Sequence, residues 1–418
     1  MTLSDKLFPA DPTRRAIARD LYGHARALPL VSPHGHVDPG ILAEDTPFPD
    51  PAHLIVVPDH YITRMLLSQG VPLADLGVPT LDGTPYETDG RAIWRRLAEH
   101  WYLFRGTPSR MWTEGVLTEI FGIPTPLRPE TADEIYDALA ERLARPEFRP
   151  RALFTRFNIE VMATTESPVD ELTHHAKLAA DGWGGPGGRV ITTFRPDNMV
   201  DFEWPGWVER VARLGEMTGT DTTTYAGFLA ALRTRRAAFI AAGATSSDHG
   251  HPTARTLCLS PAELSALFAR GLAGTATAAD AETFRAGMLV EFARMSIEDG
   301  LVMQLHPGSM RNHNRASYAR HGRDVGGDIP AQTSYVEALR PLLDAHGNDS
   351  RLRMVLFTLD ETVFSRELAP LAGGYPTLFL GAPWWFLDSP DGLRRYRDAV
   401  TETAGFYNMS GFVDDTRA

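Results

Sequence analysis

The chain is poor in two reactive side chains, with one cysteine and two lysines in 418 residues. A single cysteine, Cys258, excludes an internal disulfide and a cluster of thiolate metal ligands, so any bound metal must rely on histidine and carboxylate. We expect Cys258 itself to be an inert core residue. Lys6 and Lys177 are the lysines, so the chain beyond 177 offers no Schiff-base, phosphate-loop or carbamylated lysine.

Long apolar runs and excess positive charge are also lacking. No stretch approaches the ~20 apolar residues needed to span a bilayer, and the N-terminus lacks the basic and apolar regions of a signal peptide. A cytoplasmic location is therefore the default expectation. The net charge of −12 gives no basic surface for nucleic acid or an anionic membrane. These absences favour a small-molecule substrate, with neither nucleic acid nor membrane as a partner.

Short apolar runs that end in polar or Gly/Pro-rich clusters recur along the chain, with helical periodicity between them. The runs predict strands at 28–33, 159–164, 189–194, 244–247, 301–305, 353–359, 377–380 and 406–413. Eight β units alternating with helices predict an α/β fold, a TIM-like (β/α)8 barrel.

The interval between the first two predicted strands is much longer than one βα unit requires. It contains helical patterns at 89–104 and 131–144. We therefore predict a helical insertion after the first strand, which divides the chain into an N-terminal segment with the first strand (1–59), an insertion or cap (60–150) and the rest of the barrel (151–418).

Motifs at the two ends of the chain point to a metal site. His34 and His36 follow the first predicted strand, and at i and i+2 they project to the same side. The first and last strands are neighbours in a closed barrel, so Asp415, at the last strand, can complete a site with two histidines and one carboxylate. That donor set suits one divalent ion, best Zn²⁺. The competing interpretation is two loop histidines that cap a strand and an acid that lies in solvent.

Other strand ends carry candidates for substrate contacts. The segment 303–314 combines His306 and Arg311 with several other polar groups, which favours substrate binding over a purely structural network. His306 is alternatively a further metal ligand. Arg195, Arg311 and Arg417 offer guanidinium forks for a carboxylate, which implies an anionic substrate unless they are surface arginines.

A series of motifs runs along the chain in order: Pro33-His34-Gly35-His36, Asp59-His60-Tyr61 with Arg64, Ala163-Thr164-Thr165-Glu166, Phe194-Arg195-Pro196-Asp197, Met303-Gln304-Leu305-His306-Pro307-Gly308 with Arg311-Asn312 and Asn314, Trp384-Trp385-Phe386 with Asp388, and Asp415-Thr416-Arg417. The series resembles the uronate isomerases, the glucuronate isomerase branch of the amidohydrolase superfamily. The similarity extends from about residue 5 to the last residue.

The resemblance implies interconversion of D-glucuronate with D-fructuronate and of D-galacturonate with D-tagaturonate. It implies metal ligation by His34, His36 and Asp415, and catalytic roles for Tyr61, Asp415 and Arg417. For substrate binding, the residues that we predict are Arg195, His306, Arg311, Trp384, Trp385 and Arg64. Tyr61 is the expected proton carrier in an enediol mechanism.

Two other functions stay open on the sequence alone. The first is a mononuclear metal-dependent hydrolase or deaminase of the same superfamily; a binuclear one is disfavoured because Ser247-Asp248-His249 stands where a bridging lysine is needed. The second is a uronate-binding protein without catalysis. The sequence does not set the oligomeric state, and a homo-oligomer is one of the assemblies it allows. The family continues with a helical region beyond its Asp-x-Arg motif, so we expect further chain or another segment to cover the last strand.

Overall fold

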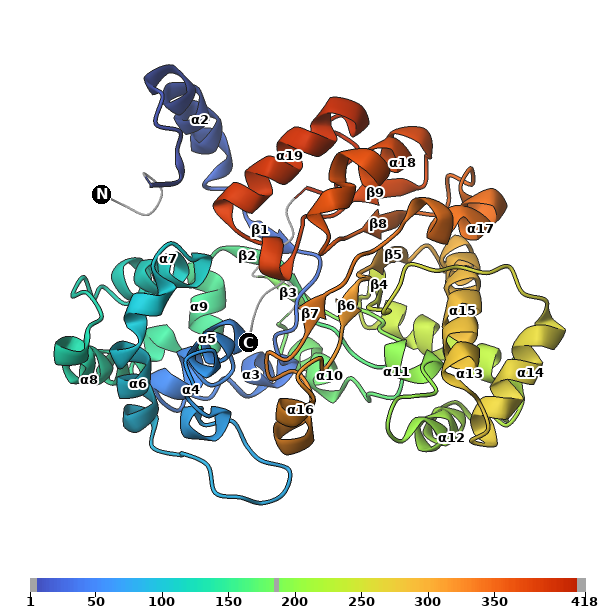
Figure 1. Ribbon diagram of the computed structural model, residues 1–418, viewed down its shortest axis with the longest axis horizontal. Coiled ribbons are helices and arrows are strands. Elements are labelled where there is room, and N and C mark those ends of the chain that lie inside the picture. The colour runs from blue at the N-terminus through green and yellow to red at the C-terminus, as the bar shows by residue number, and fades with distance from the viewer. Residues whose placement is uncertain (1–5, 184–187, 412–418) are drawn as a thin grey trace.

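Parallel strands form the centre of the molecule in the computed structural model, which describes residues 6–183 and 188–411. β1, β2 and β3 pair in that order, and β4, β5, β8 and β9 pair in a second run. A parallel bridge between Phe194 and Ser247 joins the two runs. Figure 1 shows the strands at the centre of the molecule with helices around them. The strands are β1 Leu30–Ser32, β2 Ile159–Ala163, β3 Arg189–Ile191, β4 Ser246–His249, β5 Val302–Leu305, β8 Met354–Leu356 and β9 Leu378–Leu380.

The predicted α/β fold of TIM-barrel type is confirmed, since each of these strands overlaps a predicted one. The last predicted strand, 406–413, is reduced among the described residues to one parallel bridge between Met409 and Leu380. Residues 412 and 413 lie outside the described part of the chain. Within that part, no pairing closes the ring between Met409 and β1.

Helices that alternate with the strands cover the outer face of the sheet. They are α10 Thr173–Ala180, α11 Asp197–Val200, α12 Trp207–Thr218, α13 Tyr225–Ala241, α14 Pro261–Leu272, α15 Ala278–Asp299, α17 Val336–His346, α18 Ala369–Gly374 and α19 Pro390–Ala404. Local sequence sets where some of them begin: Ser260 and Glu263 form a reciprocal capping box at the start of α14. The largest apolar core lies between these helices and the strands and runs from Phe194 to Met409.

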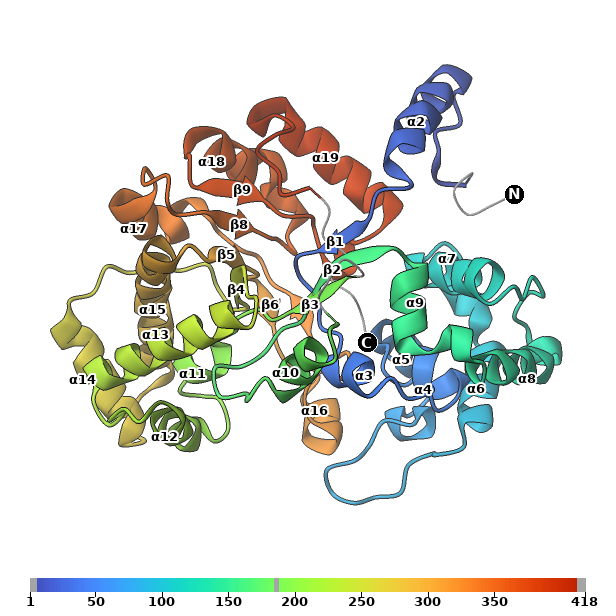
Figure 2. The same ribbon diagram turned by 180° about the vertical axis from the view of Figure 1, so that it is seen from behind.

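A group of helices between β1 and β2 forms a second lobe (Figure 2). They are α3 Pro39–Glu44, α4 Pro51–Ile55, α5 His60–Leu67, α6 Gly90–Glu99, α7 Pro108–Gly115, α8 Ala132–Leu143 and α9 Pro150–Arg156. Buried residues from Ala52 to Phe148 make a core of their own. The domain boundaries at 60 and 150 stay a prediction. Before β1, α2 (Pro12–Ala25) projects from the body and contains no buried residue.

An arm that was not predicted follows β5. Its short antiparallel strands, β6 (Ser309–Met310) and β7 (Ile329–Pro330), flank α16 (Arg315–His321). The arm begins at Gly308, where φ is +94° and a Cβ atom would overlap the Oγ1 atom of Thr333. Only glycine fits this turn without strain. The arm therefore carries Arg311 toward the carboxyl ends of the parallel strands.

The prediction that Cys258 is a core residue is wrong, because its side chain is exposed. It lies in the segment before α14, and its Sγ atom is 3.2 Å from the carbonyl oxygen of Pro341. None of the helices in the described residues combines the length and apolar character that crossing a bilayer requires.

Candidate active site

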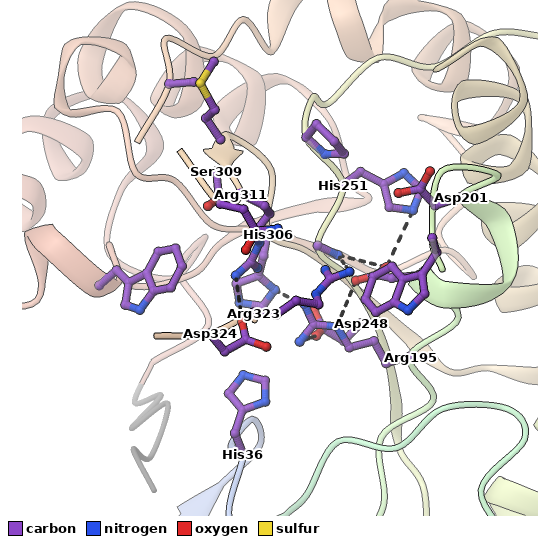
Figure 3. A pocket seen from close by; sticks show the side chains of 18 of the residues that line it. His36, Arg195, Asp201, Asp248, His251, His306, Ser309, Arg311, Arg323 and Asp324 are labelled. Carbon is purple, nitrogen blue, oxygen red and sulfur yellow. Dashed lines mark hydrogen bonds and ion pairs between the residues drawn. The ribbon is translucent and has the colours of Figure 1, made fainter. Parts of the chain in front are cut away.

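A cavity of about 1100 Å³ opens where the parallel strands end. Its lining comes from the segments after β1, β3, β4, β5 and β9, together with α5 from the second lobe and the arm after β5. The predicted site residues that line it are His34, His36, Tyr61, Arg195, His306, Arg311, Trp384 and Trp385. Figure 3 shows His36, Arg195, His306 and Arg311 around this space. The carboxyl ends of the strands thus bring together residues that are hundreds of positions apart in the sequence.

A group of three buried residues in this cavity can hold a divalent metal ion. His34, Asp248 and His306 each offer a ligand atom, and these atoms lie within 4.8 Å of one another. Two imidazole nitrogens and a carboxylate oxygen suit a borderline divalent ion. His36 is adjacent, with its ring centroid 4.9 Å from that of His34. The second interpretation of His306, as a metal ligand, is therefore compatible with the geometry.

Asp248 is the centre of a charge network beside this group. Its Oδ1 atom lies 2.6 Å from Nδ1 of His306, and its Oδ2 atom lies 3.2 Å from a guanidinium nitrogen of Arg195. Burial alone would raise the pKa of Asp248, but the charges of Arg195, His306 and His34 hold that pKa well below its ordinary value. Asp248 is therefore a carboxylate anion with no exposed surface.

Arg195 is shared between two carboxylates. Its Nε atom donates to Oδ2 of Asp197 at 2.8 Å, while another guanidinium nitrogen faces Asp248. Burial opposes the charged form, yet Asp248 and Asp197 raise the pKa of Arg195 above its ordinary value. Gly250 makes room for this arrangement, because a Cβ atom there would overlap Nη2 of Arg195 and lie 3.0 Å from Asp197.

Tyr61 reaches the cavity because of where α5 begins. Asp59 caps the helix by accepting a hydrogen bond from the backbone N–H of Tyr61 at 2.8 Å, which places Tyr61 in the first turn. The guanidinium of Arg64 lies over the ring of Tyr61 at 5.6 Å and over Phe386 at 4.7 Å. Arg64 does not line the large cavity but a small neighbouring one.

Aromatic side chains form one wall of the cavity. Trp384 and Trp385 stack with their ring centroids 4.9 Å apart, and Trp384 packs edge-on against His306. Nε1 of Trp384 is buried and makes no hydrogen bond with any described residue. Arg311 lies over Trp385 at 5.0 Å and is paired with Asp328 at 2.8 Å.

Asp415 and Arg417, the remaining predicted catalytic residues, lie outside the described residues. The predicted ligand set of His34, His36 and Asp415 therefore stays a prediction, as does the role of Arg417.

Sequence reasoning did not single out Asp248, Ser309 and Arg323, which also line the cavity. Asp248 was placed after a strand that was predicted to end at 247, whereas β4 continues to His249. Ser309 belongs to the polar segment after β5, and its buried Oγ atom makes no hydrogen bond with any described residue. The guanidinium of Arg323 stacks on Trp204 at 3.7 Å. No signal in the sequence places Arg323 near Trp204.

Glu166 lies near the site at the end of β2. Thr192 donates a hydrogen bond to its Oε2 atom, and the neighbouring Thr165 donates to the backbone oxygen of Gly35 at 2.8 Å. Burial raises the pKa of Glu166 to about 7. This segment therefore contacts the His34-Gly35-His36 motif, and burial brings the pKa of its carboxyl group close to neutral pH.

Comparisons with known proteins identify the family of the chain. The family model for glucuronate isomerase matches residues 12–418. The uronate isomerase of Rhizorhabdus wittichii is 60% identical over 414 residues, which cover 99% of this chain and 87% of that protein. The uronate isomerase of Mesorhizobium japonicum is 57% identical over 418 residues, which cover 100% of this chain and 88% of that protein.

Solved structures give the same result. The crystal structure of glucuronate isomerase from Caulobacter crescentus superposes with a TM-score of 0.96 at 54% identity, covering 99% of this chain and 85% of that one. The uronate isomerase of Thermotoga maritima superposes with a TM-score of 0.90 at 30% identity, covering 99% of this chain and 87% of that one. The chain belongs to the glucuronate isomerase family.

Proposed function

We propose that the chain is an aldose–ketose isomerase that interconverts D-glucuronate with D-fructuronate and D-galacturonate with D-tagaturonate. The observation that carries this proposal is one cavity in which a metal-binding group, Tyr61 and Arg195 line a common space in a chain of this family. An open-chain hexuronate needs these three elements: a polarised carbonyl, a proton carrier and a cation for its carboxylate.

The metal ligands that we propose are His34, His36 and Asp415, with Zn²⁺ as the ion. Asp248 and His306 each offer a ligand atom within 4.8 Å of one from His34 and would supply further donors. A bound divalent ion would polarise the substrate carbonyl and position its oxygens. The charge network from His306 through Asp248 to Arg195 keeps His306 oriented toward the same space.

Tyr61 is the proposed proton carrier. In an enediol mechanism a base removes the proton at C2 and the same proton, or one from solvent, returns at C1. Tyr61 lines the cavity and Arg64 lies over its ring, so a cation accompanies the phenol. Arg417 is proposed to stabilise the negative charge that develops on the enediol oxygens.

For substrate binding we propose Arg195 and Arg311 as positive charges at the cavity wall, with His306, Trp384 and Trp385 completing the pocket. Arg64 is proposed to contribute its charge from the small neighbouring cavity. Arg323 joins this group because it lines the cavity and, among the described residues, is held by no ion pair. Nε1 of Trp384 and Oγ of Ser309 are available for sugar hydroxyls.

Ketouronate formation from each hexuronate tests the proposal. The purified chain is assayed with D-glucuronate and with D-galacturonate, before and after chelation and with metal restored. We expect turnover of both substrates and loss of activity on chelation. Absence of any ketouronate from the metal-loaded enzyme would refute the proposed reaction.

The hydrolase alternative is not favoured by the relatives described above, which are uronate isomerases. A cytoplasmic location and a homo-oligomeric assembly stay predictions, which fractionation and sedimentation velocity would test.

A further inference from the structure

A second group of potential metal ligands lies beside the charge network of Arg195. Asp197, His249 and His251 are all buried, and one ligand atom from each lies within 4.8 Å of the others. Asp197 begins α11, His249 is the last residue of β4, and His251 follows two residues later. Figure 3 draws His251 and His36 on opposite sides of Asp248 and Arg195.

His249 and His251 carry buried nitrogen atoms that have no hydrogen-bond partner in the part of the chain that the structure describes. Neither ring nitrogen of His251 makes a hydrogen bond with any described residue, and the same is true of Nδ1 of His249. Nε2 of His249 is 3.1 Å from Oγ of Ser247, so Nδ1 is the atom that it can offer without giving up a contact. Buried polar atoms without partners are uncommon in folded proteins and require an explanation.

The spacing of these atoms fits a bridging ion better than a direct hydrogen bond. Nε2 of His251 is 3.7 Å from Oδ1 of Asp197, which is too long for a hydrogen bond. Two ligands that are each ~2.05 Å from a tetrahedral zinc ion are about 3.4 Å apart. A small side-chain movement would therefore bring both atoms to coordination distance.

The surrounding charge also favours a cation. Asp197 and Asp248 share one arginine, Arg195, and their other ion-pair partners are His251 and His306, so one negative charge is in excess when these histidines are neutral. Arg285, on the far side of His251, is paired with three acids, which leaves two further negative charges in excess. The acids are Asp201, Glu203 and Glu282. Asp197 accepts hydrogen bonds from Arg195 and from the backbone of Gly250, and its two oxygens have lone pairs to spare.

We propose that Asp197, His249 and His251 form a second site for a borderline divalent cation such as Zn²⁺, which ties the segment after β4 to the start of α11. Two imidazoles and one carboxylate are the donors that zinc accepts in such sites. Asp197 and His251 line the large cavity, so a further ligand to the ion would come from solvent or substrate. The proposal adds a second ion to the single one that the sequence predicted.

The second site is separate from the first because of strand geometry. Asp248 and His249 are consecutive residues of β4, so their side chains point to opposite faces of the strand. Asp248 turns toward His34 and His306, whereas the ring of His249 packs on Phe292 of α15. The two ions would therefore not share a bridging ligand, and the lack of a lysine after this strand is no obstacle.

Metal counting on the intact chain tests the proposal. The chelated protein is saturated with Zn²⁺, freed of excess metal and analysed for zinc per chain, with circular dichroism as a check on folding. We expect two zinc ions in the wild type, one in His251→Gln, one in the His34→Ala/His36→Ala variant, and none when all three substitutions are combined. Added Zn²⁺ should also raise the Tm of His251→Gln less than that of the wild type.

His175→Gln is the matched control, since His175 is as buried as His251 but belongs to neither group. It should keep two zinc ions. One zinc ion in the saturated wild type, or two in His251→Gln, would overturn the proposal. If His251→Gln does not fold, an anomalous diffraction map of the zinc-loaded wild type decides, because the proposal requires a peak between Asp197, His249 and His251. These measurements do not depend on isomerase activity, so they separate the second site from the proposed reaction.

Discussion

The hydroxyl of Tyr61 is the proposed proton carrier. Removing this hydroxyl is the most direct test at the scale of one residue. Tyr61→Phe keeps the aromatic ring against His60 and Phe386 and does not disturb the cap at Asp59. We therefore expect a folded protein whose kcat falls by ~100-fold or more. In deuterated water the wild type should place deuterium at C1 of the ketouronate.

Tyr102→Phe is the control for this substitution, because Tyr102 is exposed and lies outside the cavity. Its kcat should equal that of the wild type. Near-full activity of Tyr61→Phe, with complete retention of substrate hydrogen over many turnovers, would contradict both the proton-transfer route and the assignment of Tyr61.

The raised pKa of Glu166 predicts that the free energy of unfolding depends on pH. Its carboxyl has an ordinary pKa of 4.5, which applies to the unfolded chain, and burial raises the folded value to about 7. Between these values the folded state holds a proton that the unfolded state releases, so stability falls as the pH rises through this window. At ~1.4 kcal/mol per pKa unit the loss at pH 8 is on the order of 3 kcal/mol.

Glu166→Gln removes this titration while keeping an acceptor for Thr192. The Tm of the variant minus that of the wild type should therefore become more positive from pH 5 to pH 8. The same comparison for Glu130→Gln, an exposed residue, should show no such trend. A difference that does not change with pH would show that the folded pKa of Glu166 is close to its ordinary value.

The segment after β4 shows how one loop supports the site at the scale of an element. Gly250 has no positive φ, so alanine there causes no backbone strain but overlaps Nη2 of Arg195. Gly250→Ala should displace the guanidinium and weaken a charge-assisted contact worth ~1.5–3 kcal/mol, which lowers kcat/KM for hexuronates by roughly 10- to 100-fold. Steady-state kinetics measures this directly.

Gly23→Ala is the matched control, because a Cβ atom at Gly23 has nothing within 4 Å and its φ is not positive. Its kinetics should not change. Binding of neutral sugar inhibitors to Gly250→Ala should be unaffected, and an equal loss for neutral and anionic ligands would mean that the loop itself has moved.

The arm after β5 and the last two residues of β4 were not predicted from the sequence, and the reason is physical. β4 reads Ser246-Ser247-Asp248-His249, four polar residues that are all buried. Apolar runs predict strands because buried positions are usually apolar, so the polar residues Asp248 and His249 gave no signal that the strand predicted at 244–247 continues. The short strands β6 and β7 are held by pairing across 18 intervening residues and likewise leave no local pattern.

At the scale of the whole molecule, the predicted metal-binding motif of His34 and His36 lies at the ends of the strands and not in the apolar core. His34 and His36 follow β1, and the two large cores contain neither. His34→Ala combined with His36→Ala should therefore remove the metal ion of the first site without unfolding the chain. Elemental analysis measures the first effect, and circular dichroism measures the second.

A zinc content equal to that of the wild type in the double variant would place the first site elsewhere in the molecule. His24→Ala/His53→Ala, which removes two histidines outside the cavity, should leave the zinc content unchanged.

The sequence by itself determined the strand pattern, the long helical interval and the clustering of polar motifs at strand ends, because these depend on local periodicity and spacing. It identified His34, Arg195 and His306 as residues of one cavity through the geometry of a parallel barrel, and Tyr61 through the resemblance to the uronate isomerases. The roles of Asp415 and Arg417 stay predictions, since both lie outside the described residues.

Only the tertiary structure decided which charges meet. It paired Arg195 with Asp248 as well as with the nearby Asp197, and it placed Asp248 beside His34 and His306. It also separated Asp248 from His249, the next residue, by directing them to opposite faces of β4. The physical reason is that Coulomb interactions and burial depend on distances between side chains, and strands far apart in the sequence set those distances only when they pack together.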